Sequence, residues 1–422
     1  MVLNDLITSW ISLPDLPYFN IFIAIIIPIA VYFYLKPINI VKDLSDVGYD
    51  HIFKREQIKC TRKTKINVTQ ESRKKRIIGN LPPVYPNGWF AILDSDDVAV
   101  GEVKHVEALG EHFAVFRGED GQINVLNAMC PHLGANIAIG GVVKGNCIQC
   151  PFHGWIFSGL TGQCVEIPYS DNIPADGAIK RWHSCEVNTL IFVWYHAENQ
   201  SPSWHLQPIP NIHEKKWWYR GRTEYYVNSH IQEIPENGAD VTHLSVLHGP
   251  VVFAGSNLFN MSKWWANLAR HNWQASWISK TAPEEQHIGS MELYTDTVFF
   301  DKFKAFRMNV KSDQIGPGYV VLNVETFIGP MIILQTVTPV EPLVQKVVHK
   351  MFYPFVTSLY GTLTFFTESI LFERDVVIWN HKKYLDKPLL TKEENSIVKH
   401  RRWYNQFYSE NSPRVDKNTL TW

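Results

Sequence analysis

The stretch that decides the fold runs from residue 130 to residue 153. It opens with Cys130-Pro131-His132, continues through seventeen residues, and closes with Cys150-Pro151-Phe152-His153. Each end supplies one cysteine and one histidine, and a proline follows each cysteine directly. Glycines at both ends, such as Gly134 and Gly154, suit tight turns. The pattern predicts two short loops that present four metal-binding side chains to one point.

Two thiolates and two imidazoles form the ligand set of a Rieske [2Fe–2S] cluster, in which Cys130 and Cys150 bind one iron and His132 and His153 bind the other. Neutral imidazoles leave less negative charge on the cluster than thiolates, which raises its reduction potential. A structural zinc site is the alternative, because zinc also takes cysteine and histidine. Zinc hairpins usually pair Cys-x₂₋₄-Cys with His-x₃₋₅-His, whereas each loop here mixes the two ligand types, which favours the cluster.

A second group of candidate ligands lies in Asn237-Gly238-Ala239-Asp240-Val241-Thr242-His243-Leu244-Ser245-Val246-Leu247-His248. His243 and His248 are five residues apart, and a regular helix would separate their directions by about 140°. A bend or a helix end at Gly249-Pro250 is needed to bring both rings to one metal. Taken alone, two histidines at this spacing are more often ordinary polar residues.

Together the two motifs resemble those of the Rieske non-haem iron oxygenases, in which Asn-x-x-Asp-x-x-His-x₄-His follows the cluster motif. The resemblance implies that His243 and His248 belong to a 2-His-1-carboxylate triad for Fe(II), whose open positions take O₂. It also implies a third ligand far downstream, and the best match is Asp375 in the apolar stretch 355–385, which we expect to be a buried helix. The competing acids on that stretch are Glu368 and Glu373.

The resemblance assigns Asp240 and Asn237 to the catalytic machinery without making them ligands. It implies that Asp240 connects the histidines of the mononuclear iron with a Rieske histidine of a neighbouring subunit, in a homotrimer. A carboxylate bonded to a ligating imidazole fixes its tautomer and tunes the metal. The alternative for Asp240 is a helix-capping or solvent-facing acid. Asn237 either supports the ligands or belongs to an Asn237-Gly238 turn.

Residues 16–35 (LPYFNIFIAIIIPIAVYFYL) contain no charged side chain, and twenty helical residues span about 30 Å. We expect a transmembrane helix over 16–36, rather than a signal peptide or a buried core helix, because no basic segment precedes it and no convincing cleavage site follows. Basic residues gather after it, as in Arg73-Lys74-Lys75-Arg76. The positive-inside rule then puts the rest of the chain in the cytosol, and we expect a single-pass protein of the endoplasmic reticulum. A net charge of −1 argues against nucleic-acid binding.

The expected organisation is α+β, with an N-terminal transmembrane helix, a small antiparallel β-domain and a helix-grip-like catalytic domain. In the catalytic domain, strand candidates at 223–230, 291–300, 304–311, 318–328 and 331–340 precede the 355–385 helix. The predicted segments are a short non-cytosolic N-terminus (1–15), the membrane helix (16–36), a basic juxtamembrane linker (37–84), the cluster domain (85–200) and the catalytic domain (201–422). The cysteines outside the motif are expected to be free thiols: Cys60, Cys147, Cys164 and Cys185.

No G-x-G-x-x-G motif follows a strand candidate and no Walker loop is present, so the chain shows no nicotinamide or flavin site of its own. Electrons from NAD(P)H must therefore arrive through a separate reductase. The stretches 236–244 and 373–384, taken with the membrane helix and the basic linker, resemble the Neverland-type cholesterol 7-desaturases over nearly the whole chain. That resemblance implies conversion of cholesterol to 7-dehydrocholesterol with O₂, an early step toward steroid hormones.

Three alternatives stay open. The first is a Rieske oxygenase that hydroxylates a steroid or another lipid. The second is a membrane-tethered Rieske electron carrier, which would hold two irons per chain where an oxygenase holds three. The third is a non-catalytic lipid-binding protein on a similar scaffold.

Overall fold

The structure of the protein is a computed structural model that describes residues 25–29, 31–32, 36–49, 52–53 and 62–415. The chain divides into two compact units, Met1–Ile38 and Asn39–Trp422, and both metal-binding motifs lie in the second. Most of the predicted membrane helix, and Cys60, fall outside the described residues. Within the described ranges, no helix is long and apolar enough to cross a membrane.

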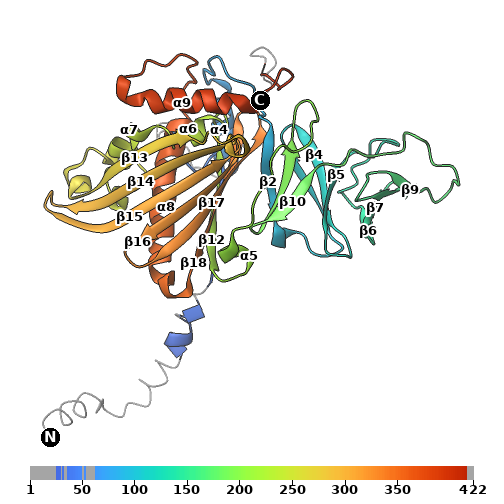
Figure 1. Ribbon diagram of the computed structural model, residues 1–422, viewed down its shortest axis with the longest axis horizontal. Helices are drawn as coiled ribbons and strands as arrows, with labels where there is room; N and C mark the ends of the chain where they lie inside the picture. Colours follow the sequence, from blue (N-terminus) through green and yellow to red (C-terminus); the bar gives the residue numbers. More distant parts are fainter. Residues whose placement is uncertain (1–24, 30, 33–35, 50–51, 54–61, 416–422) are drawn as a thin grey trace, which may run out of the picture. The chain divides into compact units, whose positions relative to one another are not determined.

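The larger unit is built on one sheet of eight strands, in the order β1-β12-β18-β17-β16-β15-β14-β13 (Figure 1). Its strands are β1 (Ile38–Lys42), β12 (Trp218–Val227), β13 (Ala269–Ser279), β14 (Ile288–Phe299), β15 (Phe303–Ile315), β16 (Tyr319–Thr326), β17 (Pro330–Glu341) and β18 (Val344–Tyr353). From β13 to β18 each strand pairs antiparallel with the next one in the chain, so successive hairpins build most of the sheet.

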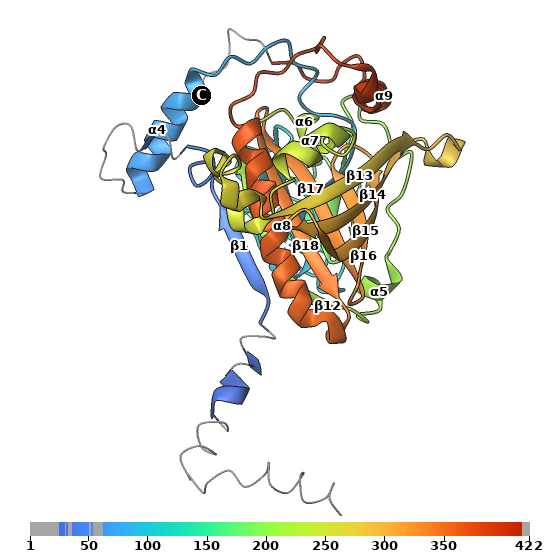
Figure 2. The ribbon, with the colours of Figure 1, turned by 90° about the vertical axis from the view of Figure 1, so that its left-hand side faces the viewer.

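Helix α8 (Ser358–Trp379) lies across one face of this sheet (Figure 2). Phe372 and Val376, four residues apart and therefore on one side of the helix, pack in the main core with Tyr225 of β12 and Val347 of β18. A sheet covered by one long apolar helix is the α+β arrangement that the sequence predicted. The other helices are α4 (Arg62–Lys74), α5 (Pro210–His213), α6 (Glu233–Glu236), α7 (Val241–Leu247) and α9 (Asn395–Tyr404).

The five predicted strands of this unit overlap β12, β14, β15, β16 and β17. The sequence analysis missed β13 and β18, because polar side chains such as Asn272, Gln274 and Lys350 interrupt their apolar pattern. It also missed β1, which lies in the stretch predicted to be a linker. The predicted helix also ends earlier than residue 385. Asn380 follows α8, and its side chain accepts a hydrogen bond from the Asn228 N–H (2.9 Å) and donates one to the Val47 carbonyl (3.0 Å).

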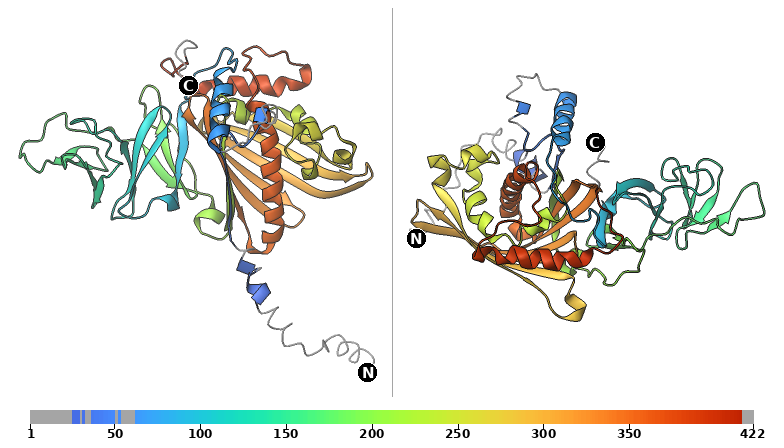
Figure 3. Two further views of the ribbon diagram at one scale, coloured as in Figure 1. Left: turned by 180° about the vertical axis from the view of Figure 1, so that it is seen from behind. Right: turned by 90° about the horizontal axis from the view of Figure 1, so that it is seen from above.

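Three small antiparallel sheets occupy the stretch between residues 88 and 195 (Figure 3). The first is β10-β11-β2, the second β3-β4-β5 and the third β6-β7-β8-β9. Their bounds are β2 (Gly88–Asp94), β3 (Val103–Ala108), β4 (Glu111–Arg117), β5 (Ile123–Asn127), β6 (Val142–Lys144), β7 (Cys147–Gln149), β8 (Ile156–Ser158), β9 (Cys164–Glu166), β10 (Ser184–Val187) and β11 (Leu190–Tyr195). The two cysteine–histidine loops precede β6 and follow β7, so they belong to the third sheet.

The first two small sheets share a hydrophobic core with the large sheet, whereas the third small sheet packs in a separate cluster. Phe90 of β2 is fully buried in the same cluster as Val337 of β17. Thr338 Oγ1 donates to the Ala91 carbonyl at 2.7 Å. A Cβ atom on Gly318 would lie 2.5 Å from the Val337 carbonyl oxygen and 2.9 Å from the Phe90 ring, so only glycine permits this approach. The two parts are therefore packed against each other rather than joined only by a linker.

Candidate active site

Each of the two cysteine–histidine loops contains the same type of backbone turn. The Gly134 N–H donates to the Cys130 carbonyl at 2.9 Å, and the Gly154 N–H donates to the Cys150 carbonyl at 3.1 Å. Both glycines have positive φ, 73° and 78°, a conformation that any side chain would strain. The repeated turn directs the ligand candidates of both loops toward one point.

The four side chains of these loops meet in two pairs, one of cysteines and one of histidines. The thiols of Cys130 and Cys150 are buried and hydrogen-bonded to each other, and burial raises the pKa of Cys130 to about 11. The rings of His132 and His153 have centroids 4.6 Å apart. His132 Nδ1 is buried without a hydrogen-bond partner, although Trp155 stacks on the ring at 4.8 Å. Paired buried thiols beside an unsatisfied imidazole nitrogen fit the ligand set of a [2Fe–2S] cluster.

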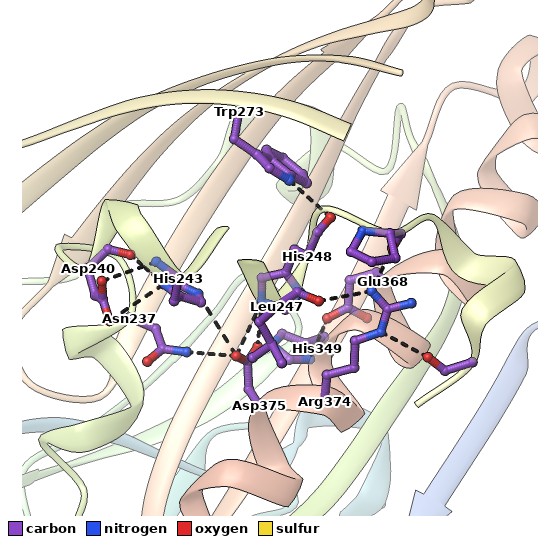
Figure 4. Close-up of polar contacts among 12 residues, drawn as sticks. Asn237, Asp240, His243, Leu247, His248, Trp273, His349, Glu368, Arg374 and Asp375 are labelled. Carbon is purple, nitrogen blue, oxygen red and sulfur yellow. Dashed lines mark hydrogen bonds and ion pairs between the residues drawn. The ribbon is translucent and has the colours of Figure 1, made fainter. Parts of the chain in front are cut away.

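His243, His248 and Asp375 come together from distant parts of the chain, and their donor atoms all lie within 4.8 Å of one another (Figure 4). His248 Nε2 is 3.2 Å from Asp375 Oδ2, and His243 Nε2 is 3.9 Å from Asp375 Oδ1. Neighbouring ligands of a transition metal with bonds of about 2.1 Å lie about 3 Å apart. The three side chains therefore fit one metal ion with a face left open.

The end of α7 explains how His243 and His248, five residues apart, can face the same point. The helix ends at Leu247, and His248 has the non-helical angles φ −103° and ψ 5°. The ring of His248 therefore departs from the helical rotation, and its centroid lies 5.1 Å from that of His243. A helix end just before Gly249-Pro250 is what the sequence required for both rings to reach one ion.

Asp240 is the N-cap of α7. Its carboxylate accepts from the His243 N–H at 3.3 Å and from Thr242 Oγ1 at 2.9 Å. The carboxylate Oδ2 is 3.8 Å from His243 Nδ1, but the backbone carbonyl of Asp240 is the closer partner of that nitrogen. With Nδ1 held in this way, Nε2 is the nitrogen that faces Asp375. Asp240 thus caps the helix and also orients the histidine, while its contact with another subunit stays a prediction.

Asn237 and the competing acids have distinct positions. Asn237 Nδ2 donates to Asp375 Oδ1 at 3.0 Å, so it supports the carboxylate rather than only forming a turn. Glu373 Oε1 lies 4.0 Å from Lys42 Nζ, and Glu368 Oε1 lies 3.1 Å from His349 Nδ1. Neither competing acid belongs to the group formed with the two histidines.

The sequence analysis missed Arg374, which has no exposed surface although it carries a charge. Its guanidinium donates to four backbone carbonyls in the chain that follows α7: Leu247 (3.1 Å), Pro250 (2.7 Å), Val251 (3.1 Å) and Gly255 (2.9 Å). Burial lowers the pKa of Arg374 to about 10, and the adjacent charge of Asp375 opposes this effect. In the sequence, an arginine next to an acid is typical of a solvated ion pair. The only sign that Arg374 is buried was its position in a long apolar stretch.

A cavity of about 290 Å³ lies between α8 and the large sheet, and His243, His248 and Asp375 form part of its wall. Most of its lining is apolar. The sheet contributes Met291, Leu293, Met308, Val310, Leu322, Val324, Met331 and Ile333. Such a lining suits a largely hydrophobic ligand.

One corner of the cavity is polar, and we define it by Gln335, His349 and Glu368. Gln335 and His349 are direct partners across β17 and β18, so their side chains share one face of the sheet. His349 Nδ1 is 3.1 Å from Glu368 Oε1 and 3.2 Å from Thr223 Oγ1. Burial raises the pKa of Glu368 to about 8, helped by the charge of Asp375, and burial lowers the pKa of His349 to about 3. Burial therefore favours the neutral form of both groups.

Comparison with known proteins agrees with this arrangement. Residues 88–182 match the model of the Rieske [2Fe-2S] domain, and residues 193–408 match the model of the 3-ketosteroid 9alpha-hydroxylase C-terminal domain. The crystal structure of dicamba monooxygenase bound to dicamba has the same fold, with a TM-score of 0.56 at 14% identity, covering 77% of this chain and 98% of that one. The two domains and the site define a Rieske oxygenase.

Two similar proteins show to which family of Rieske oxygenases the chain belongs. The cholesterol 7-desaturase nvd of Xenopus laevis is 44% identical over 384 residues, which cover 90% of this chain and 82% of the relative. The cholesterol 7-desaturase nvd of Drosophila melanogaster is 39% identical over 406 residues, 94% of each chain. The chain belongs to the cholesterol 7-desaturase family.

We predict that Asp375→Asn removes the mononuclear iron, because the triad loses its only negative ligand. Iron per chain should fall from about three to about two, with the visible absorbance of the cluster unchanged. The matched control is Glu373→Gln, two residues earlier on α8, which should keep the full iron content. Metal analysis of both purified variants tests the choice between the acids. The choice is wrong if Glu373→Gln loses the iron and Asp375→Asn keeps it.

We also predict that Arg374→Met destabilises the protein by on the order of 3–5 kcal/mol, because four buried carbonyls lose their donor. Mononuclear iron should bind more weakly while the cluster stays intact, since the loop after His248 is no longer fixed. Urea unfolding and iron titration measure the two effects. Arg307→Met is the control, because that side chain is 69% exposed and, among the described residues, donates to no backbone carbonyl near the site, its ion-pair partner being Asp296. Unchanged iron affinity in Arg374→Met would contradict the positioning role.

Proposed function

We propose that this protein desaturates cholesterol at C7–C8 to give 7-dehydrocholesterol, using O₂ and electrons that NAD(P)H supplies through a separate reductase. The observation that carries the proposal is a 2-His-1-carboxylate group in the wall of an apolar cavity, on the same chain as a Rieske ligand set. The names of the two relatives support the substrate. The lack of a dinucleotide-binding motif supports the separate reductase.

Two groups of residues would hold the metals. Cys130, Cys150, His132 and His153 would hold the [2Fe–2S] cluster, and His243, His248 and Asp375 would hold Fe(II). When bound, these groups supply single electrons and the activation of O₂. The reaction removes one hydrogen from C7 and one from C8, and with two further electrons and two protons O₂ becomes two waters.

The chain's own contribution at the iron site is to fix the ligands before the metal arrives. The Asp240 carbonyl holds His243 Nδ1, so that Nε2 faces the site. Asn237 donates to Asp375 Oδ1 and restricts the rotation of that carboxylate. Arg374 holds the segment that carries His248. His243 and Asp375 therefore each have a hydrogen-bond partner that sets their direction, whereas His248 is positioned through the backbone on either side of it.

The polar corner would bind the sterol hydroxyl. Several other polar residues of the cavity are already engaged: Gln314 bonds to His400 and Gly316, and Thr364 and Thr367 donate to carbonyls of α8. With His349 Nδ1 held by Glu368 and Thr223, Nε2 is the ring nitrogen that remains for a hydroxyl, with the Gln335 amide beside it.

The spacing along α8 supports this orientation. Glu368 precedes Asp375 by seven residues, so the two acids share a helix face about 10 Å apart along the axis. The hydroxyl of cholesterol is on ring A and C7 is on the fused ring B. A sterol held by its hydroxyl in the polar corner would therefore direct ring B toward His243, His248 and Asp375.

The remaining expectations from the sequence belong to the same proposal. They are a transmembrane helix over 16–36, a single-pass location in the endoplasmic reticulum with the catalytic part in the cytosol, a homotrimer, and domain boundaries at 85–200 and 201–422. The uncharged stretch 16–35 and the basic residues after it support the membrane helix. The family matches over 88–182 and 193–408 support the boundaries.

A second candidate is hydroxylation of a steroid, favoured by the match of residues 193–408 to a 3-ketosteroid 9alpha-hydroxylase domain. The product separates the two reactions, because a hydroxylase adds an oxygen atom and a desaturase adds none.

We predict that cells lacking this activity, fed cholesterol and expressing the chain, accumulate 7-dehydrocholesterol in sterol mass spectra. His243→Ala should give none, because one triad ligand is missing. A hydroxylated sterol from the unmodified chain would mean that the reaction type is wrong. Untouched cholesterol from a protein that carries its irons and accepts electrons would mean that the substrate is wrong.

We predict that His349→Ala weakens cholesterol binding about fivefold, because one hydrogen bond to the hydroxyl is worth about 1 kcal/mol. The same variant should bind cholest-5-ene, which lacks the hydroxyl, as tightly as the unmodified protein does. Thr367→Val is the control, because its hydroxyl is bonded within α8. Equal weakening toward both sterols would show a packing role and remove the polar corner from the substrate site.

A further inference from the structure

Large apolar side chains lie exposed on neighbouring turns at one end of the large sheet. We define this aromatic rim by Phe253, Phe259, Trp264, Phe300, Phe303 and Phe327. Phe253, Phe259 and Trp264 are 78%, 79% and 76% exposed. An exposed apolar group of this size marks a surface that another phase or partner covers.

The rim is continuous although it comes from separate segments. The first is the loop that holds η2 (Val252–Ala254), η3 (Leu258–Asn260) and η4 (Trp264–Asn267). The Phe300 N–H, in the turn between β14 and β15, donates to the Leu268 carbonyl at the end of this loop, at 2.8 Å. Phe306 then contacts Phe299 and Phe327, with centroids 6.0 and 5.5 Å apart. Figures 1 and 3 show the loop and the β14–β15 turn at the same end of the sheet.

This end of the sheet is also the end of the cavity. Phe306 is two residues from Met308, and Phe327 stands between Val324 and Met331 in the chain, all three being cavity-lining residues. On α8, exposed Leu363 and Phe366 alternate with Thr364 and Thr367, which line the cavity. A ligand that enters here passes the rim.

The charged residues around the aromatic rim indicate what kind of surface it contacts. Lys263, Lys302 and Lys304 are exposed beside the aromatic residues, and Asp301 and Glu325 are exposed acids near them in the chain. Aromatic residues mixed with lysines are typical of protein surfaces at the headgroup level of a membrane, where lysine heads meet anionic lipid. Interfaces between proteins are instead depleted in lysine.

We propose that the aromatic rim inserts into the surface of a lipid bilayer, so that a sterol moves from the bilayer into the cavity without crossing water. The contact with lipid is separate from the N-terminal segment, and it goes beyond the proposed function. Only the identity of the transferred lipid rests on that function.

The first test uses the full chain in phosphatidylcholine–phosphatidylserine vesicles whose acyl chains carry bromine, which quenches tryptophan fluorescence at short range. The double variant Trp264→Phe/Trp265→Phe changes the rim tryptophan and its neighbour, which is 37% exposed. The lipid-quenched part of the fluorescence should fall by roughly a third or more, because these rings lie in the lipid. Trp403→Phe, at a buried position, should leave the quenched part unchanged. This readout needs neither turnover nor iron. An unchanged quenched part in the double variant overturns the proposal.

The second test separates lipid contact from contact between copies of the chain. Phe253→Ser/Phe259→Ser should lower kcat/KM at least about tenfold for cholesterol in vesicles and leave it unchanged for cholesterol carried by cyclodextrin. Leu389→Ser, which removes a fully exposed apolar side chain elsewhere, is the control. A changed oligomeric state of the serine variant, with equal loss for both forms of cholesterol, would assign the rim to a subunit contact. If no sterol product forms under any condition, the proposed function fails while the quenching result still decides the rim.

Discussion

The guanidinium of Arg374 is buried among the carbonyls of Leu247, Pro250, Val251 and Gly255, next to the carboxylate of Asp375. One residue of α8 thereby fixes the chain that leaves α7, and the next residue faces both histidines. A buried charge persists only when its donors are satisfied, so the four carbonyls are a condition of the fold as well as of the site. The packing of α8 on the sheet, through Phe372 and Val376, keeps this pair in place.

Along α8, the residues near the aromatic rim come first, the polar corner comes next and the triad comes last. This order matches the distribution of polar and apolar groups in a sterol. Exposed Leu363 and Phe366 lie near the rim, Glu368 belongs to the polar corner, and Asp375 belongs to the triad. The large sheet supplies an apolar floor beneath them. A substrate with one hydroxyl on a rigid apolar skeleton can bind in this cavity with its hydroxyl at the polar corner and its reacting carbon at the triad. Its polar end and its reacting carbon lie a fixed distance apart.

The local motifs could be predicted from the sequence, because ligand chemistry restricts both residue type and spacing. The Cys-Pro-His and Cys-Pro-Phe-His loops, the histidines of α7 and the helix that carries Asp375 are of this kind. Features that depend on tertiary partners could not be predicted. Arg374 looked like an ordinary surface charge until its four carbonyls were known, and His349 lies on β18, whose lysines and glutamine concealed a strand. The sequence analysis did not identify the aromatic rim, since composition does not distinguish a buried Phe from an exposed one.

The central claim is that the sterol lies with C7 at the group of His243, His248 and Asp375. Electron–nuclear double resonance on the Fe(II)–nitric oxide form of the protein tests this directly, because it detects deuterium only close to the iron. Cholesterol labelled with deuterium at C7 should give a clear coupling, and cholesterol labelled in the alkyl tail should give none. A coupling from the tail and none from C7 would mean that the sterol lies the other way round, and that the polar corner does not hold its hydroxyl.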